Sequence, residues 1–591
     1  MSSTMPVFED TPVPQEAMTI LMKLFHEIEV PAEVRDVAQN TIFTGTAEPI
    51  LPLPHKHFAI ASALQGLYGA FASHIFALRT GETPSSVSVD VDHAGLSLAG
   101  LMLVEVDGKP LCSALKRIPK IPAEDPLWYQ PIKSMVSTVY RCTDGVYFHP
   151  HGSLNPRFTI ASMGIEPDLE VDEQGAREAV QAFVERRTAS DMLQWSVGLG
   201  LPGDVCLRPA EFDNSGHGHI ASAWKLITPH AQREDLTPPI RFLKSPNTGR
   251  PLDGIKVLEM TRVIAGPAIG RHLAELGATV VRFISPHLPD YGFYFQPDFN
   301  LGKRAVHIDL RTDRGKAQLR HLLEEADIFV HGYRPGVTDR LGFGNEVLNQ
   351  IAVNRGKGFV IVSENAYGHE GPWAWRPGFQ QIADVVSGLA WETGAACGQN
   401  APIVPCWPIT GTSIPHNSRL GLGILTELSD ILRPVVMSEH IIDYCTGLMG
   451  AIAVLQGLIK RSRHGGSWHA PVSLLQYALF ARKQGQYSHA YVRALYESGP
   501  RHTGAHAMPA MTSAQISHLK TTMPTLFDAR FFETSGSSYG VIRHLKRVVR
   551  FTEAEDMPSG FGYSPSWGES KVGWDDEDAQ QLEAELRRAG L

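Results

Sequence analysis

The sequence predicts an α/β protein whose main domain is a doubly wound parallel sheet covered by helices. Two observations predict this fold class. From residue 253 onward, short apolar runs alternate with longer amphipathic runs, and strands that alternate with helices imply a parallel sheet. The chain also has 591 residues, which is too long for one compact core, so two to four domains are expected.

The alternation begins after the loop-forming cluster Ser-Pro-Asn-Thr-Gly-Arg-Pro at 245–251. The run IKVLEM, 255–260, is typical of a buried strand. The run PAIGRHLAELG, 267–277, predicts a helix, because Pro267 suits a first turn and Gly277 a C-terminal stop. The same pattern then predicts strands at 278–284, 305–310, 327–332 and 359–364, and helices at 314–326 and 345–353.

The N-terminal half is less regular but contains an internal similarity. We expect a helix at 56–79, strands and turns at 128–152, and one or two amphipathic helices at 175–200. Segment 63–89 overlays segment 447–473 without a gap. Both read as an apolar Gly/Ala-rich helix, an Arg-x-Gly stop and a short strand, with Ala59 opposite Asp443.

Composition limits the class of protein and its partners. With 43% hydrophobic and 19% charged residues the chain is typical of a globular protein, and its net charge of −9 argues against nucleic acid or an anionic membrane as partner. The six cysteines form no C-x-x-C pair, which favours a reducing compartment over a disulfide framework or zinc site. The acidic N-terminus resembles no targeting signal, and no run of 18 apolar residues suggests a membrane span. We therefore expect a cytoplasmic protein.

The first strand–turn–helix, LEMTRVIAGPAIGRHL, lies where a doubly wound sheet binds nucleotides or phosphates. It has neither G-x-G-x-x-G nor a P-loop, so NAD and P-loop nucleotides are not expected. Alternatively, Gly266 and Gly270 only permit close helix–sheet packing. Basic residues at predicted strand ends and turns could bind a ligand with several phosphates, and we expect about half of these to touch it: Arg262, Arg282, Lys303, Arg304, Arg311, Arg334 and Arg340.

Other common catalytic motifs are missing from the sequence. The histidine pairs in PHKHF, HPHGS and SGHGHI have no carboxylate or cysteine at a recurring offset, so no metal site is expected. A G-x-S-x-G elbow is absent as well. These absences disfavour a metalloenzyme and a serine hydrolase of that type.

One acid, Asp443, stands among small and apolar residues in EHIIDYCTGLMG, 439–450. A carboxylate can attack a thioester as a covalent nucleophile, provided that oxyanion donors are present and water is limited. Backbone N–H groups near Thr446, Gly447 and Gly450 could serve as donors. The local sequence by itself favours the alternative that Asp443 is a helix cap.

Three ordered segments resemble class III CoA-transferases, the formyl-CoA transferase and carnitine CoA-transferase (CaiB/BaiF-like) group. They are PLDGIKVLEMTRVIAGPAIGRHLAELGATVVRF, then GKRAVHIDLRTDRGKAQLRHLLEEADIFVHGYRPGVTDRLGFG, and GHEGPWAWRPGFQQIADVVSGLAWETG. Asp443 in DYCTG takes the position of the family's aspartate nucleophile. The resemblance covers about 250–395 and 436–480 closely.

The resemblance implies a CoA-transferase that moves CoA from an acyl-CoA to a carboxylic acid through an aspartyl anhydride and an aspartyl-CoA thioester. CoA and acyl-CoA are then substrates, and neither a tightly bound cofactor nor a metal is expected. An acyl-CoA racemase of the same fold is an alternative, although its histidine position is Phe379 here, and a non-catalytic CoA-binding scaffold is another. The implied CoA-binding residues are Ile264, Ala265, Ile308, Arg311, Gly332, Tyr333 and Arg340.

The resemblance also implies a domain organisation. Residues 1–245 resemble a degenerate first half with a smaller α+β domain and no nucleophile, and 246–252 is a linker. Residues 253–480 form the Rossmann-like CoA-binding domain with an insertion at 395–435, and 481–591 are a tail that returns to it. The chain is thus an incomplete tandem duplication, expected to form an interlaced pseudo-dimer within one polypeptide, or a homodimer.

Overall fold

The fold was analysed in a computed structural model of the chain. It describes residues 6–111, 114, 130–232, 237–242, 249–288, 295–404, 441–498, 516, 518–551 and 561–591. Most of the predicted insertion 395–435 and part of the predicted linker 246–252 lie outside these residues.

The centre of the molecule is a mostly parallel sheet. Within the described ranges it has seven strands in the order β11-β10-β9-β12-β13-β14-β8, and only β8 runs antiparallel. The strand order reverses between the neighbours β9 and β12: the chain continues from β9 to β10 on one side, and from β12 to β13 on the other. The strands are β8 (His230–Ala231), β9 (Lys256–Met260), β10 (Thr279–Ile284), β11 (Lys303–His307), β12 (Ile328–His331), β13 (Val360–Asn365) and β14 (Trp468–Ser473).

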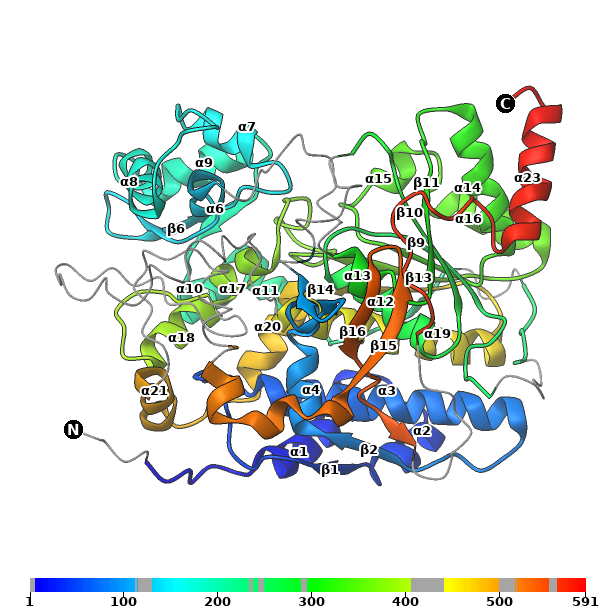
Figure 1. The fold of residues 1–591 in the computed structure, drawn as a ribbon, viewed down its shortest axis with the longest axis horizontal. Coiled ribbons are helices and arrows are strands. Elements are labelled where there is room, and N and C mark those ends of the chain that lie inside the picture. Colours follow the sequence, from blue (N-terminus) through cyan, green and yellow to red (C-terminus); the bar gives the residue numbers. More distant parts are fainter. Residues whose placement is uncertain are drawn as a thin grey trace.

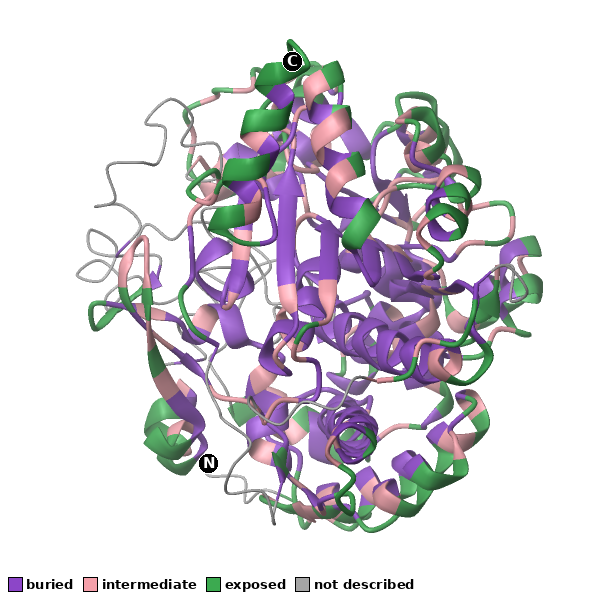
Figure 2. Ribbon diagram, turned by 90° about the vertical axis from the view of Figure 1, so that its right-hand side faces the viewer, coloured by how far each residue is buried: buried purple, intermediate pink, exposed green. Residues whose placement is uncertain are grey.

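Helices cover both faces of this sheet (Figure 1). Successive strand residues enter opposite cores, as the period of two requires: Val257 packs in the larger core, whereas Leu258 packs in the second. The larger core contains α12 (Ala265–Glu275) and α19 (Ile441–His464), and the second contains α14 (Asp313–Glu325) and α16 (Asn345–Arg355). The predicted α/β class is therefore confirmed, and Figure 2 shows the sheet and inner helices as the buried part of the molecule.

Two long helices pack against each other at the centre of the larger core. The first, α3 (His57–Thr80), and α19 have 24 residues each, and their ends coincide when the overlay of 63–89 on 447–473 is extended. Among the described helices, α19 is long and apolar enough to cross a membrane, but its apolar window is wholly buried inside the protein. Such burial is typical of a core helix.

The first half contributes a smaller α+β unit with its own core. This unit contains α6 (Pro131–Met135), α7 (Pro156–Ser162), α8 (Glu173–Val184), α9 (Ala189–Gly198), β5 (Tyr140–Arg141), β6 (Tyr147–Pro150) and β7 (Gly203–Val205). The expected strands and turns at 128–152 are thus interrupted by a short helix, because Pro131 suits a first turn. One or two helices are expected within 175–200, and the structure has two there, α8 and α9.

Strands of the two halves pair with each other. From the first half, β8 joins the edge of the main sheet beside β14. From the tail, β16 (Gly540–Leu545) pairs with β3 (Glu105–Val106), and β17 (Arg550–Phe551) pairs with β2 (Val87–Asp90). The last helix, α23 (Asp576–Arg588), returns to α14, where Asp578 accepts a hydrogen bond from His321 at 2.8 Å.

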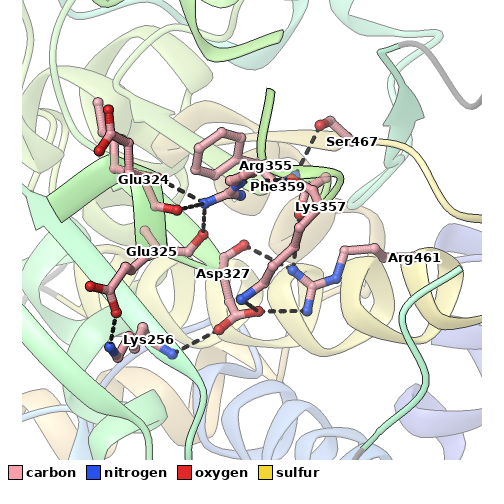
Figure 3. Close-up of polar contacts among 12 residues, drawn as sticks. Lys256, Glu324, Glu325, Asp327, Arg355, Lys357, Phe359, Arg461 and Ser467 are labelled. Atoms are coloured by element: carbon pink, nitrogen blue, oxygen red, sulfur yellow. Dashed lines mark hydrogen bonds and ion pairs between the residues drawn. The ribbon is translucent and has the colours of Figure 1, made fainter. Parts of the chain in front are cut away.

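An ion-pair cluster ties α19 to the edge of the sheet opposite the carboxyl ends of the strands (Figure 3). The Asp327 carboxylate contacts Arg461 at 2.9 Å and Lys357 at 2.8 Å, and it accepts a hydrogen bond from the backbone N–H of Lys256. Burial alone would raise the pKa of Asp327, but Arg461 and Lys357 outweigh it and hold the pKa below its usual value. Since Arg461 lies in the last turn of α19, this cluster fixes the far end of the helix that carries Asp443.

Candidate active site

The candidate site lies at the carboxyl ends of β9 and β12, where the strand order reverses. Open α/β sheets bind ligands at this place because the two connections diverge and leave a crevice. Ile264 caps α12, and Ala265 is its first residue. Gly332 follows β12 and donates a backbone hydrogen bond to the carbonyl of Met260 at 3.1 Å. The structure therefore places the predicted residues Ile264, Ala265 and Gly332 at the reversal point.

The turn between β9 and α12 is strained. Val263 has a φ of 68°, in the left-handed region that a β-branched residue rarely adopts. Such strain costs of order 1–3 kcal/mol and persists only where the surrounding structure imposes it. Here it lets the chain turn sharply from β9 into α12, so that the first N–H groups of the helix lie at the crevice.

Asp443 occupies the first turn of α19, and its side chain is buried. A carboxylate in the first turn is stabilised by the helix dipole. Gly447, one turn later on the same face, lies so close to α12 that a Cβ there would be 2.9 Å from the carbonyl oxygen of Ala265. The face of α19 that carries Asp443 is therefore packed against the start of α12, next to the predicted CoA-binding positions.

A buried polar cluster lies beside the start of α19. The side-chain oxygen of Gln380 accepts a long hydrogen bond from the backbone N–H of Asp443, at 3.4 Å. The amide nitrogen of Gln380 donates to Asp384 at 3.0 Å, which fixes the orientation of the amide. Burial raises the pKa of Asp384 well above its usual value, although the hydrogen bond from Gln380 opposes this shift.

Two residues of the first half also border this cluster. The His151 ring stacks on Phe379 with centroids 4.4 Å apart and planes 5° apart, and Phe379 directly precedes α17 (Gln380–Ser387). His57 shares a 3.0 Å hydrogen bond with the Tyr477 hydroxyl at the start of α20 (Leu474–Lys483). The site is therefore built from both halves of the chain.

Sequence reasoning did not identify Gln380, Asp384 or His151 as site residues. Their sequence signals were present in the runs RPGFQQIAD and HPHGS, but nothing local distinguishes these residues from ordinary polar ones. Only the fold brings His151 to Phe379, more than two hundred residues further along the chain.

The other predicted CoA-binding residues follow β11 or β12 at the same edge of the sheet. Tyr333 adjoins Gly332, and Arg340 lies at the end of the exposed helix α15 (Val337–Arg340). The Ile308 side chain is buried in the second core, so only its backbone could face a ligand. Arg311 is exposed, and its guanidinium contacts Asp309 at 2.9 Å.

Besides Arg311, three of the seven basic residues expected at strand ends and turns pair with carboxylates of the protein. Arg282 and Lys303 lie within β10 and β11 rather than after them, and both point into the protein. They pair with the buried Glu259 at 3.0 and 2.7 Å, so they neutralise an internal carboxylate instead of binding phosphates. Gly270 permits this cluster, because a Cβ there would lie 1.8 Å from a Glu259 oxygen. Arg304 is also paired, with Asp576 at 2.9 Å.

Comparison with known proteins shows which family the chain resembles. CoA-transferase family III matches residues 252–515. The acyl-CoA transferase of Gibberella moniliformis (strain M3125 / FGSC 7600) is 31% identical over 578 residues, covering 95% of both chains. The acetyl-coenzyme A transferase nodX of Hypoxylon pulicicidum is 29% identical over 574 residues, covering 92% of this chain and 90% of the relative.

Among solved structures, the hypothetical protein Rv3272 from Mycobacterium tuberculosis is 28% identical and covers 40% of this chain and 57% of its own, with a TM-score of 0.30. The similarity to the two fungal transferases, in contrast, extends over nearly the whole chain. The chain therefore belongs to CoA-transferase family III and is a CoA-transferase.

Proposed function

We propose that the enzyme moves CoA from an acyl-CoA donor to a carboxylic acid acceptor, with Asp443 as the covalent nucleophile. The observation that carries this proposal is the position of Asp443, in the first turn of α19 and packed beside the start of α12. Both helices begin at the edge of the sheet where the strand order reverses. The names of the two fungal relatives support an acyl-CoA as the donor.

In the first half-reaction, an Asp443 carboxylate oxygen attacks the thioester carbonyl carbon of the donor. The carbon–sulfur bond breaks, CoA leaves as a thiolate, and a mixed anhydride forms between Asp443 and the acyl group. The thiolate then attacks the Asp443 carbonyl carbon of this anhydride. The donor acid leaves as its carboxylate, and Asp443 becomes an aspartyl-CoA thioester.

In the second half-reaction, the same two steps run in reverse with the acceptor. The acceptor carboxylate attacks the aspartyl thioester, releases the CoA thiolate and forms a second anhydride. The thiolate attacks the acceptor's carbonyl carbon, which yields the new acyl-CoA and restores the Asp443 carboxylate. No oxidant, metal or bound cofactor takes part in these steps.

Each attack creates an oxyanion that needs nearby donors. The N–H groups in the first turn of α12 have no partner within the helix and suit this role. The burial of Asp443 limits the access of water, which would hydrolyse the anhydride. We propose that CoA lies along the carboxyl ends of β9, β11 and β12, against Ile264, Ala265, Ile308, Arg311, Gly332, Tyr333 and Arg340.

The test is to trap the acyl-enzyme. We expect incubation with a panel of acyl-CoAs and hydroxylamine to convert Asp443 into a hydroxamate, detected by peptide mass spectrometry. Asp443→Asn should give no adduct and lose at least about 10³-fold in kcat. Asp36→Asn, which changes an exposed aspartate in α2 (Ala32–Ala38), is the control and should react like the wild type. An adduct at another residue, or normal turnover by Asp443→Asn, would exclude this mechanism.

A second candidate activity is racemisation at the α-carbon of an acyl-CoA. One observation favours it. Racemases of this fold have a histidine at the position of Phe379, and here the ring of His151, from the first half, stacks directly on Phe379. A histidine and an aspartate could exchange the α-proton from opposite sides. Incorporation of deuterium at the α-carbon in D2O, without transfer of CoA, would support this activity over the first.

We also propose that the two halves form a pseudo-dimer within one cytoplasmic chain, with a doubly wound, Rossmann-like sheet in the second half. The coincident ends of α3 and α19 and the strand pairing between the halves support this organisation. Light scattering should then give the mass of a single chain. A stable homodimer would contradict the proposal.

A further inference from the structure

Glu364 is a carboxylic acid at the carboxyl end of β13, immediately beside the reversal point. In the parallel pairing of β12 with β13, His331 lies opposite Ser363, so Gly332 and Glu364 are neighbours. A Cβ on Gly332 would lie 3.2 Å from a Glu364 oxygen and 3.9 Å from the Cβ of Thr261, the residue that follows β9. The Glu364 carboxyl therefore lies over the ends of β9 and β12, where CoA is proposed to bind.

This carboxyl has no hydrogen-bond or ion-pair partner among the residues that the structure describes. Burial alone raises the pKa of Glu364 to about 7, and no neighbouring charge contributes to the shift. The carboxyl is therefore mostly neutral at slightly acidic pH and mostly ionised at about pH 8. Glu364 is partly buried, and the part of its surface that stays open is where a ligand could supply a hydrogen-bond partner.

The histidines on the elements packed around β13 do not change their charge in the pH range in which Glu364 ionises. On the flanking strands, burial lowers the pKa of His331 to about 3 and that of His469 to about 4, so both stay neutral near pH 7. Burial also lowers the pKa of His369, in the connection after β13. Glu259, on β9, is paired with Lys303 and Arg282. The connections that follow β9, β12 and β13 also contain other charged residues, of which Arg376 pairs with Asp204 at 3.0 Å. The others are Arg262, Arg334, Asp339, Arg340 and Glu370.

CoA combines two parts that respond differently to a carboxyl group. Its pantetheine arm is neutral and carries two amide groups, whose carbonyl oxygens accept hydrogen bonds. Its nucleotide end carries several phosphate charges. A neutral carboxyl donates a hydrogen bond to an amide carbonyl, whereas an ionised carboxylate can only accept and repels the phosphates.

We propose that Glu364 is a positioning residue that donates a hydrogen bond from its neutral carboxyl to an amide carbonyl of the pantetheine arm. Ionisation of Glu364 removes this donor and adds a repulsive charge, so CoA binding weakens as the pH rises. This inference rests on the proposed CoA site. It adds a residue on β13 that neither the sequence motifs nor the family resemblance single out, and it makes CoA affinity depend on pH.

The test measures the binding of CoA itself, by calorimetry on the full chain that carries Asp443→Asn, so that no covalent chemistry interferes. Because only the neutral form of Glu364 supports tight binding, the CoA Kd should rise about tenfold from about pH 6 to about pH 8. Glu364→Gln keeps an uncharged donor and should bind tightly at both pH values. Glu364→Leu has no donor and should bind weakly at both.

Glu370→Gln is the matched control, because it removes an exposed acid in the connection after β13 and should keep the wild-type pH dependence. Changes in the ionisation of CoA affect all variants equally and cancel in their ratios. The inference is overturned if Glu364→Gln keeps the wild-type pH dependence, if Glu364→Leu binds like the wild type at about pH 6, or if CoA does not bind. If CoA binds with the expected pH dependence but Asp443 cannot be trapped, the proposed role of Asp443 as nucleophile is excluded, and the role of Glu364 is not.

Discussion

At the scale of single residues, the place of Asp443 depends on Gly447. A Cβ on Gly447 would lie 2.4 Å from the Cβ of Ala268 and 2.9 Å from the carbonyl oxygen of Ala265. Carbon atoms in contact are normally about 3.5–4.0 Å apart, so any side chain here must move α19 away from α12. Since Asp443 precedes Gly447 by one turn on the same face, its carboxylate would move with the helix.

We therefore expect Gly447→Ala to lower kcat/KM by about 10- to 100-fold, because small displacements of a reacting group are costly. It should also lower the free energy of unfolding by about 1–3 kcal/mol through overpacking. Steady-state kinetics and urea unfolding measure the two effects. Gly198→Ala is the control, because a Cβ at the end of α9 meets no atom within 4 Å. Wild-type kinetics in Gly447→Ala would show that the contact does not position Asp443.

At this scale, the sequence predicts a role for Asp443 and for the β9–α12 turn, but only because a family resemblance adds to their local context. It could not identify Gln380, Asp384, His151 or Glu364. The roles that we assign to these four residues depend on what they contact, and those contacts join segments far apart in the chain. Likewise, the sequence positions of Arg282 and Lys303 make them candidates for ligand binding, whereas the pleat of the strands turns both side chains inward.

At the scale of elements, α19 is held at both ends. Its first turn packs beside α12, and its last turn is fixed by the contact of Arg461 with Asp327. Asp327 directly precedes β12, so the same contact sets the position of α19 along the sheet. The cluster lies at the opposite edge of the sheet from Asp443 and serves stability rather than chemistry.

Asp327→Asn should lower the free energy of unfolding by about 3–5 kcal/mol, because it leaves the buried Arg461 without its carboxylate. Adding Arg461→Met should recover part of this loss, since the uncompensated charge is then removed. Glu33→Gln is the control, because Glu33 pairs with Arg463, which lies in the same last turn of α19 as Arg461. Both Glu33 and Arg463 are exposed, so the loss of unfolding free energy should not exceed about 1 kcal/mol. Equal losses in Asp327→Asn and Glu33→Gln, measured by urea unfolding, would contradict the anchoring role.

Elements were the scale at which sequence reasoning succeeded best. The predicted strands 255–260, 278–284 and 359–364 match β9, β10 and β13 within one residue at each end, because buried parallel strands read as continuous apolar runs. The strand predicted at 305–310 is shifted, and β11 is Lys303–His307. Here the buried Lys303 looked like a turn residue, since its partner Glu259 lies on β9 and is invisible to a local pattern.

At the scale of the whole molecule, each half depends on the other for strand pairing and for burial of its core. The second half contains Asp443 and most of the main sheet, but β8 and the small α+β unit come from the first half. The first half contains β2 and β3, which pair with β17 and β16 of the tail. Helix α3 buries one side of α19 in the shared core. A half produced alone would therefore expose apolar surface and unpaired strand edges.

We expect residues 246–591 produced alone to lack a cooperative unfolding transition and CoA-transferase activity, although they contain Asp443 and the predicted CoA-binding residues. Co-production with residues 1–245 should restore both properties, because the paired strands and the α3–α19 contact can then form without a covalent link. The intact chain at the same concentration is the reference for activity and for circular dichroism during thermal unfolding. If 246–591 alone folds cooperatively and turns over acyl-CoA, then the first half is dispensable, and His151 and His57 cannot be parts of the site. If the two pieces instead form an active complex, the active site requires both halves of the chain.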